Sequence, residues 1–207
     1  MLKHIKHFIE QSWLLIVSSF VFGLLLAGAN AAWMPRIQQN KIDKLNRLMS
    51  GLLSGAEKFE VAVAGMEIDL PKGRTAKTDV YKALSADGKC IGWAFVAEGS
   101  GFADKIELVV AVDKSFEKLA GYNVLSSNET PGFGDQIKLD YYRDQFKDAP
   151  ATKLELVKTG NAERIDSEIV AITGATISSQ AVVDILNNYI GQVKKQLSAK
   201  GLIGDGK

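Results

Sequence analysis

Hydroxyl side chains and small residues stand where a helix is expected to begin. The run Thr173–Thr176, of sequence Thr-Gly-Ala-Thr, is followed by Ile-Ser-Ser-Gln and by apolar residues at helical spacing as far as Leu197. The first turn of a helix has N–H groups without intrahelical partners and the positive end of the helix dipole, which together favour an anion such as phosphate. Such residues more often cap helices, and Thr176, Ser178 or Ser179 could do so here. The run therefore predicts either a cap or the attachment point of a phosphate-bearing group.

A second run able to contact a ligand lies between a predicted strand and a predicted helix. It covers Ser127–Asp135 and contains a proline and two glycines, which force a turn and let the backbone approach a planar ligand closely. Phe133 offers a stacking surface, while Glu129 and Thr130 can form hydrogen bonds to polar ring edges. The alternative is an ordinary turn in which Asp135 caps the next segment. Taken together with the first run, this second run indicates a ligand-binding loop.

The residue inventory excludes several kinds of catalytic and redox site. Both histidines, His4 and His7, precede the uncharged N-terminal segment, and Cys90 is the single cysteine. The rest of the chain therefore cannot supply an intrachain disulfide, a Cys/His zinc site, a Ser-His-Asp triad or the thiolates of an iron–sulfur cluster. Cys90 is expected to be buried in an apolar strand. We predict no catalytic residue and no metal site, so redox chemistry would require an organic cofactor.

The N-terminal segment is expected to cross a membrane. From Gln11 to Pro35 the chain carries no charge, and about 20 apolar residues suffice to cross the hydrocarbon core. Trp13 and Trp33 lie at the two ends, where interfacial tryptophans are found. The alternative is a cleaved signal peptide, because residues 27–31 contain small residues at cleavage-site spacing. We predict a tail over 1–11, a transmembrane anchor over 12–35 and a helical stalk over 36–57.

The remainder of the chain predicts an α+β domain over 58–207. Two apolar strands flank Asp87 and Gly88, a pair typical of a hairpin turn. Strands that follow one another in sequence, with helices towards the ends, favour an antiparallel sheet flanked by helices. The predicted strands are 80–84, 90–96, 106–112, 119–125, 154–157 and 169–172, and the predicted helices are 139–146 and a C-terminal one that begins near Ser178.

Together the two runs resemble the motifs of the FMN-binding domain family. More narrowly, the whole chain resembles the G subunit of Rnf electron-transport complexes, which is related to the C subunit of the sodium-pumping NADH:quinone reductase. The resemblance implies that a flavin transferase, with FAD as donor, attaches FMN covalently through its phosphate to Thr176. It also implies that three residues shape the attachment turn, namely Thr173, Gly174 and Ala175. The residues that it implies as flavin contacts are Glu129, Thr130, Gly132 and Gly134.

Two positions differ from the motif that is usual in the family. An aspartate commonly stands six residues before the modified threonine, where this chain has Val170. A histidine often stands two residues before the Glu-Thr pair, where this chain has Ser127. The first difference predicts less efficient attachment by the transferase, and the second predicts a different polar environment for the flavin.

The resemblance implies an electron-relay subunit rather than a stand-alone catalyst. Its complex would couple ferredoxin and NAD to ion transport, with iron–sulfur and flavin proteins as partners in the membrane. A flavin transferase would act during maturation, and lipid would surround the anchor. A net charge of +1 gives no basis for binding nucleic acid. The alternatives are an anchored FMN-binding sensor, a maturation module for another respiratory enzyme, or an anchored binding domain without flavin.

We expect a single-pass protein of a bacterial or archaeal cell membrane. Basic residues lie on both sides of the span, at Lys3 and Lys6 before it and at Arg36 and Lys41 after it. Their distribution therefore does not set the orientation. A short tail followed by a large domain favours a cytoplasmic tail and a domain on the extracytoplasmic side.

Overall fold

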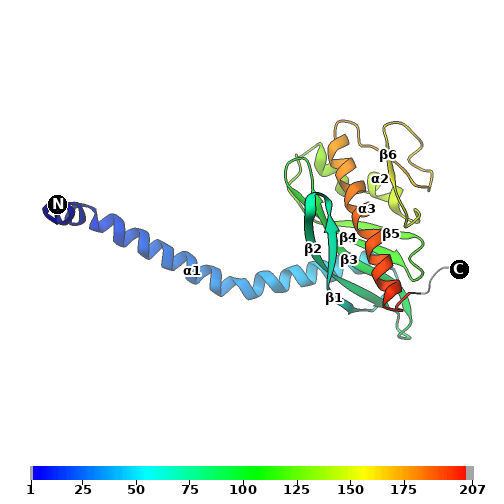
Figure 1. Cartoon of the computed structure of the whole chain (residues 1–207), viewed down its shortest axis with the longest axis horizontal. Helices are drawn as coiled ribbons and strands as arrows, with labels where there is room; N and C mark the ends of the chain where they lie inside the picture. Colours follow the sequence, from blue (N-terminus) through cyan, green and yellow to red (C-terminus); the bar gives the residue numbers. More distant parts are fainter. Residues whose placement is uncertain (1, 204–207) are drawn as a thin grey trace. The chain divides into compact units, whose positions relative to one another are not determined.

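The computed structural model describes residues 2–203, which fall into two compact units (Figure 1). The first unit is Met1–Asp43 and the second is Lys44–Lys207. Residues 1 and 204–207, at the ends of the predicted tail and of the predicted domain, lie outside the described residues.

The first helix, α1, spans Leu2–Leu52. From Ser12 onward it contains a stretch with a mean hydropathy of 2.1, which is long and apolar enough to cross a membrane. Large apolar side chains are exposed along this stretch, among them Leu15 at 71% and Phe20 at 69%, and a helix that is apolar all round is typical of a membrane span. Pro35 lies inside α1. The predicted apolar helix and its predicted continuation are therefore one helix.

The second unit is built on a five-stranded antiparallel sheet (Figure 1). Its order is β1-β2-β3-β4-β5, so each strand pairs with its neighbour in sequence. The strands are β1 Lys58–Leu70, β2 Arg74–Leu84, β3 Cys90–Ser100, β4 Lys105–Asp113 and β5 Leu119–Ser127, and the short helical turn η1 Pro71–Gly73 joins the first two. The predicted α+β class with an antiparallel sheet is confirmed.

Three local details of the sheet bear on the sequence-based predictions. The predicted Asp-Gly hairpin joins β2 to β3, and Gly88 adopts a φ of 71° there. No strand was expected at β1, which is an edge strand with irregular pairing to β2. Cys90 was expected to be buried but is only partly buried, because it stands at the first position of β3 where the pairing shifts register.

The long helix α3, Thr176–Ala199, packs against β3, β1 and β4 on one face of the sheet (Figure 1). Apart from Ile177 in the first turn, its large apolar residues recur at helical spacing and are buried, which is the pattern of an amphipathic helix on a core. Phe95 of β3 stacks on Phe116 and on Tyr189 of α3, with 6.4 Å between ring centroids in each pair. These contacts fix the direction of α3 and so the place of its first turn.

The opposite face of the sheet is covered by the end of α1. Met49 is fully buried there against small residues such as Ala94 and Ala111. The side-chain amide of Asn123 donates to the Leu48 carbonyl at 3.0 Å. A Cβ at Gly92 would lie 2.8 Å from a methyl carbon of Leu53, so that position has no room for a side chain. The stalk predicted over 36–57 is thus divided, since its part from Lys44 onward belongs to the second compact unit.

Short elements connect β5 to α3. They are η2 Gly134–Lys138, α2 Asp140–Arg143, η3 Asp144–Phe146 and a parallel pair of strands, β6 Glu155–Val157 and β7 Glu168–Val170. The single helix predicted over 139–146 is wrong, because this segment is one α-helical turn followed by a tighter 3₁₀ turn. Tyr142 and Phe146 are both fully buried, with ring centroids 5.4 Å apart. Packing of these two rings, rather than helical propensity, sets the path of the segment.

Candidate functional site

The two sequence motifs meet at one cleft of about 500 Å³. One wall comes from the turn that precedes α3 and from the first turn of α3 itself. The other comes from the loop after β5, and Phe102 joins them from the turn between β3 and β4. The lining residues are Phe102, Thr130, Phe133, Gly134, Gly174, Ala175, Thr176, Ile177 and Ser178. Segments far apart in sequence therefore form a single site.

The turn before α3 depends on its glycine. Gly174 has a φ of 81°, in the left-handed region that favours glycine. Ala175 follows as the N-cap residue, and its amide donates to the Ile172 carbonyl at 3.0 Å. Thr176 is the first residue of α3, so the helix begins two residues before the predicted position near Ser178. Thr176 is exposed and lines the cleft.

No side chain caps the N-terminus of α3. The hydroxyl of Ser178 donates to Glu129. The hydroxyl of Ser179 donates to the Ala175 carbonyl and accepts the Ile172 N–H, at 3.0 Å each. The interpretation of Thr176, Ser178 or Ser179 as a helix cap is therefore wrong.

The first turn of α3 keeps its amides available for a ligand. Its first intrahelical bond runs from the Ser179 N–H to the Ala175 carbonyl at 2.9 Å. The N–H groups of Thr176, Ile177 and Ser178 consequently have no intrahelical acceptor, which is the usual basis of anion binding at a helix N-terminus. The cleft beside them is lined mainly by apolar side chains and small residues. These features fit an aromatic ligand that carries a phosphate.

The loop after β5 contributes a tight turn and an exposed ring. The Thr130 carbonyl accepts the N–H groups of Phe133 and Asp135 at 3.2 and 3.3 Å. Gly132 has a φ of 77°, which explains glycine at this position, although it does not line the cleft. Phe133 is 57% exposed and lies along the cleft with Thr130. The loop thus presents a stacking surface beside Thr176.

Glu129 occupies a different place from the other predicted contacts. It is only 4% exposed and does not line the cleft. One carboxylate oxygen accepts the Ala103 N–H at 3.0 Å, and the other accepts the Ser178 hydroxyl. Gly134 is buried next to them, and a Cβ there would lie 2.6 Å from the Glu129 carboxylate. Contact between Glu129 and a flavin stays a prediction, since both of its oxygens already bind within the chain.

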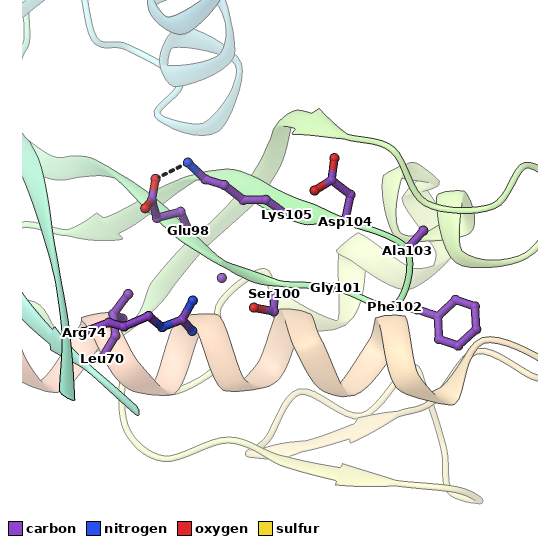
Figure 2. A pocket seen from close by; sticks show the side chains of 10 residues that line it. Leu70, Arg74, Glu98, Ser100, Gly101, Phe102, Ala103, Asp104 and Lys105 are labelled. Carbon is purple, nitrogen blue, oxygen red and sulfur yellow. Dashed lines mark ion pairs between the residues drawn. The ribbon is translucent and has the colours of Figure 1, made fainter. Parts of the chain in front are cut away.

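A second cavity, of about 340 Å³, lies along the β3–β4 hairpin and is drawn in Figure 2. Lys105 forms ion pairs with Glu98 at 2.6 Å and Glu107 at 2.9 Å, and hydrogen bonding to these carboxylates raises the pKa of the Lys105 ammonium. Arg74 and Phe102 line the same cavity and are drawn at its opposite ends in Figure 2. This second cavity is lined by side chains of both charges and by no residue of either motif, so the cleft at Thr176 is the stronger candidate site.

Comparison with known proteins identifies the family of this domain. Residues 101–191 match the FMN-binding domain family. The chain is 30% identical over 182 residues, 88% of its length and 92% of the relative's, to the G subunit of the ion-translocating oxidoreductase complex of Methanosarcina acetivorans. It is 32% identical over 179 residues, 86% of its length and 88% of the relative's, to the G subunit of the proton-translocating ferredoxin:NAD(+) oxidoreductase complex of Clostridium ljungdahlii.

Two solved structures share the fold. The NqrC protein of Shewanella oneidensis superposes with a TM-score of 0.53 at 24% identity, covering 72% of this chain and 71% of that one. The C subunit of the Na⁺-translocating NADH-quinone reductase of Parabacteroides distasonis gives a TM-score of 0.57 at 18% identity, covering 83% and 98%. Fold, cleft and family match together define an FMN-binding domain. The chain belongs to the family of G subunits of ion-translocating oxidoreductase complexes.

Sequence reasoning missed two residues of the cleft. Phe102 is 64% exposed at the tip of the β3–β4 hairpin, and Ile177 is 59% exposed in the first turn of α3. An exposed phenylalanine beside Gly101, between two predicted strands, was a signal that could have drawn attention to Phe102. Nothing local in the sequence connects that hairpin tip with Thr176.

Proposed function

We propose that this chain carries FMN in a covalent phosphoester to Thr176 and relays electrons within an Rnf-type complex. The observation that carries the proposal is the position of Thr176. It is an exposed hydroxyl in the first turn of an uncapped helix, and it lines a cleft to which the second motif also contributes. The names of the relatives, which include a ferredoxin:NAD⁺ oxidoreductase complex, support the relay role.

The residues around Thr176 would hold the two ends of the cofactor. The free amides of the first turn of α3 would bind the phosphate, because they combine unpaired N–H groups with the positive end of the helix dipole. Thr173, Gly174 and Ala175 would shape the turn that presents the hydroxyl. Thr130, Gly132 and Gly134 would form the loop beside the ring. The flavin supplies the capacity to accept and release electrons, and the chain fixes its place and surroundings.

Six residues before Thr176, where the motif of the family commonly has aspartate, the transferase would meet Val170. Val170 ends β7 and is partly buried. The Gln145 side chain binds its backbone on both sides, accepting from the Val170 N–H at 2.8 Å and donating to its carbonyl at 3.2 Å. The strand before the attachment turn is therefore held firmly without a carboxylate at this position.

The apolar part of α1 would place the domain at a membrane. We propose a cytoplasmic tail over 1–11, an anchor over 12–35 surrounded by lipid, and a domain on the extracytoplasmic side. The partners would be iron–sulfur and flavin subunits of the same complex, with a flavin transferase acting during maturation. An anchored flavin-binding sensor or maturation module would share the cofactor but not these partners.

Expression with and without a flavin transferase tests the attachment. With the transferase, the denatured protein should fluoresce under ultraviolet light, and trypsin should yield a flavin-bearing peptide, residues 165–194, whose fragment ions place the flavin on Thr176. Flavin on Thr173 or Ser178 would refute the residue assignment, and a colourless protein would refute the cofactor. Co-purification with membrane-bound iron–sulfur subunits would support the relay, whereas a flavinylated protein isolated without them would favour the sensor or maturation module.

A further inference from the structure

Glu129 is a buried carboxylate at the junction of three segments. Its own segment follows β5, while its oxygens accept the Ala103 N–H of the β3–β4 turn and the Ser178 hydroxyl of α3. With 4% exposure, it is the one buried Asp, Glu, Lys or Arg side chain in the part of the domain that the structure describes. Hydrogen bonds to a charged group contribute more to stability than hydrogen bonds between neutral groups. Because burial of an unpaired carboxylate is costly, both partners are needed to keep it there.

Two glycines provide the space for this carboxylate. A Cβ at Gly101 would collide with one oxygen of Glu129, and a Cβ at Gly134 would lie 2.6 Å from the other. Neither glycine has a positive φ. Their lack of a side chain is therefore explained by the close approach of Glu129, together with the Asp104 carbonyl at Gly101 and the Ser178 hydroxyl at Gly134, rather than by backbone conformation.

The contacts of Glu129 determine where the rim of the cleft lies. Phe102 stands next to Ala103, whose amide Glu129 binds, and lines the cleft. The same hairpin tip is closed by a 2.7 Å bond from the Gly101 N–H to the Asp104 carbonyl. On the other side, Ser178 lies two residues beyond Thr176 in the first turn of α3. One side chain thus connects the segment that carries Phe102 with the turn that carries Thr176.

We propose that Glu129 is a positioning residue for the flavin ring. Its bonds to Ala103 and Ser178, called here the carboxylate clasp, hold Phe102 over the cleft beside the attachment turn. The inference rests on the proposed function for the identity of the ligand, but the clasp itself belongs to the protein without flavin. Glutamine would preserve both links, since its oxygen can accept from Ala103 and its amide can donate to the Ser178 oxygen. Alanine would preserve neither.

Hydrogen exchange on protein made without the transferase tests the clasp independently of the cofactor. In Glu129→Ala, exchange at the Ala103 amide should accelerate by about ten-fold or more, as expected when a hydrogen bond to a charged acceptor is lost. Glu129→Gln should retain most of the protection. Glu98→Ala is the matched control, because it removes from the same hairpin a carboxylate whose ion pair is with Lys105. Equal protection of Ala103 in the Glu129→Ala variant and the wild type would overturn the proposal.

The flavinylated protein gives the second readout. Glu129→Ala should retain covalent flavin on Thr176 but shift the visible spectrum and midpoint potential, Phe102→Ala should shift them in the same direction, and Glu129→Gln should restore them. Unchanged spectrum and potential in both alanine variants would overturn the positioning role. If Glu129→Ala does not fold, Ser178→Ala, which removes the link to the attachment turn, replaces it in the flavin measurement, and Glu129→Asp, whose side chain is one methylene shorter, replaces it in the exchange measurement at Ala103. A wild type without flavin would refute the proposed function, while the exchange result would still decide the clasp.

Discussion

Replacing Thr176 with alanine should separate cofactor attachment from folding. The N-cap of α3 is Ala175, and no side chain caps the helix. Loss of a real N-cap would cost about 1 kcal/mol, but here that interaction does not exist. Alanine is also the better helix former, by up to about 0.7 kcal/mol. The free energy of unfolding of Thr176→Ala should therefore stay within about 0.5 kcal/mol of wild type or rise slightly.

Ser179→Ala provides the opposite control in the same turn. Ser179 is fully buried, and its hydroxyl accepts the Ile172 N–H while donating to the Ala175 carbonyl. Its loss leaves a buried N–H unpaired and should cost about 1–3 kcal/mol. Because its hydroxyl is not the attachment site, flavin should remain on Thr176. The two variants should thus show opposite patterns of stability and labelling.

Urea unfolding of protein made without the transferase measures stability, and in-gel flavin fluorescence of protein made with the transferase measures attachment. Thr176→Ala should lose all covalent flavin, and Thr176→Ser, which keeps a hydroxyl, should keep a part of it. Destabilisation of Thr176→Ala by more than about 1 kcal/mol would show that the hydroxyl caps the helix after all. Covalent flavin retained in Thr176→Ala would refute the attachment site.

Four further predictions concern the packing, a buried tyrosine and the apolar helix. Gly134→Ala should destabilise the domain by about 1–3 kcal/mol through overpacking, whereas Gly191→Ala, in open space on α3, should be neutral or stabilising; thermal denaturation compares them. Met49→Ala should cost about 2–5 kcal/mol, measured by urea unfolding, because this side chain is fully buried on the sheet. Burial raises the pKa of Tyr142 above its ordinary 10.0, so the contribution of this side chain to the free energy of unfolding should be constant up to about pH 10 and fall above it; urea unfolding should show a less steep fall above pH 10 in Tyr142→Phe than in the wild type. Full-length protein should stay in membranes after carbonate washing, and a chain lacking 1–35 should not; release of the full-length protein would contradict the anchor.

Features that depend on local sequence could be predicted. The hairpin turn at Asp87 and Gly88 needs only its own residues and two flanking apolar runs, and it is present. The apolar N-terminal helix and the amphipathic α3 follow from composition and periodicity alone. The resemblance to the FMN-binding domain family, carried by two short motifs, was likewise confirmed.

Features that depend on tertiary contacts could not be predicted. Glu129 was assigned to the flavin because its neighbours in sequence suggest a binding loop, yet its partners Ala103 and Ser178 are distant in sequence. The hydroxyl side chains of the first turn of α3 predicted a helix cap, but the Ser178 hydroxyl donates to Glu129 and the Ser179 hydroxyl donates to the Ala175 carbonyl. The end of α1 looked like part of a stalk because nothing in it reveals that Met49 is buried against the sheet.

The space that Gly101 and Gly134 leave for Glu129 has a consequence for how this chain can diverge. A single change at either glycine meets the carboxylate, and a change of Glu129 alone leaves a void and two unmatched polar groups. These positions therefore resist change one at a time. Alanine at 134 would need a shorter side chain at 129 and a shift of Ser178, and alanine at 101 would also meet the Asp104 carbonyl oxygen at 2.8 Å. Natural or designed variants of this domain should therefore retain Gly101, Glu129 and Gly134 together or replace them together. The three residues constrain any redesign of the cleft for another cofactor.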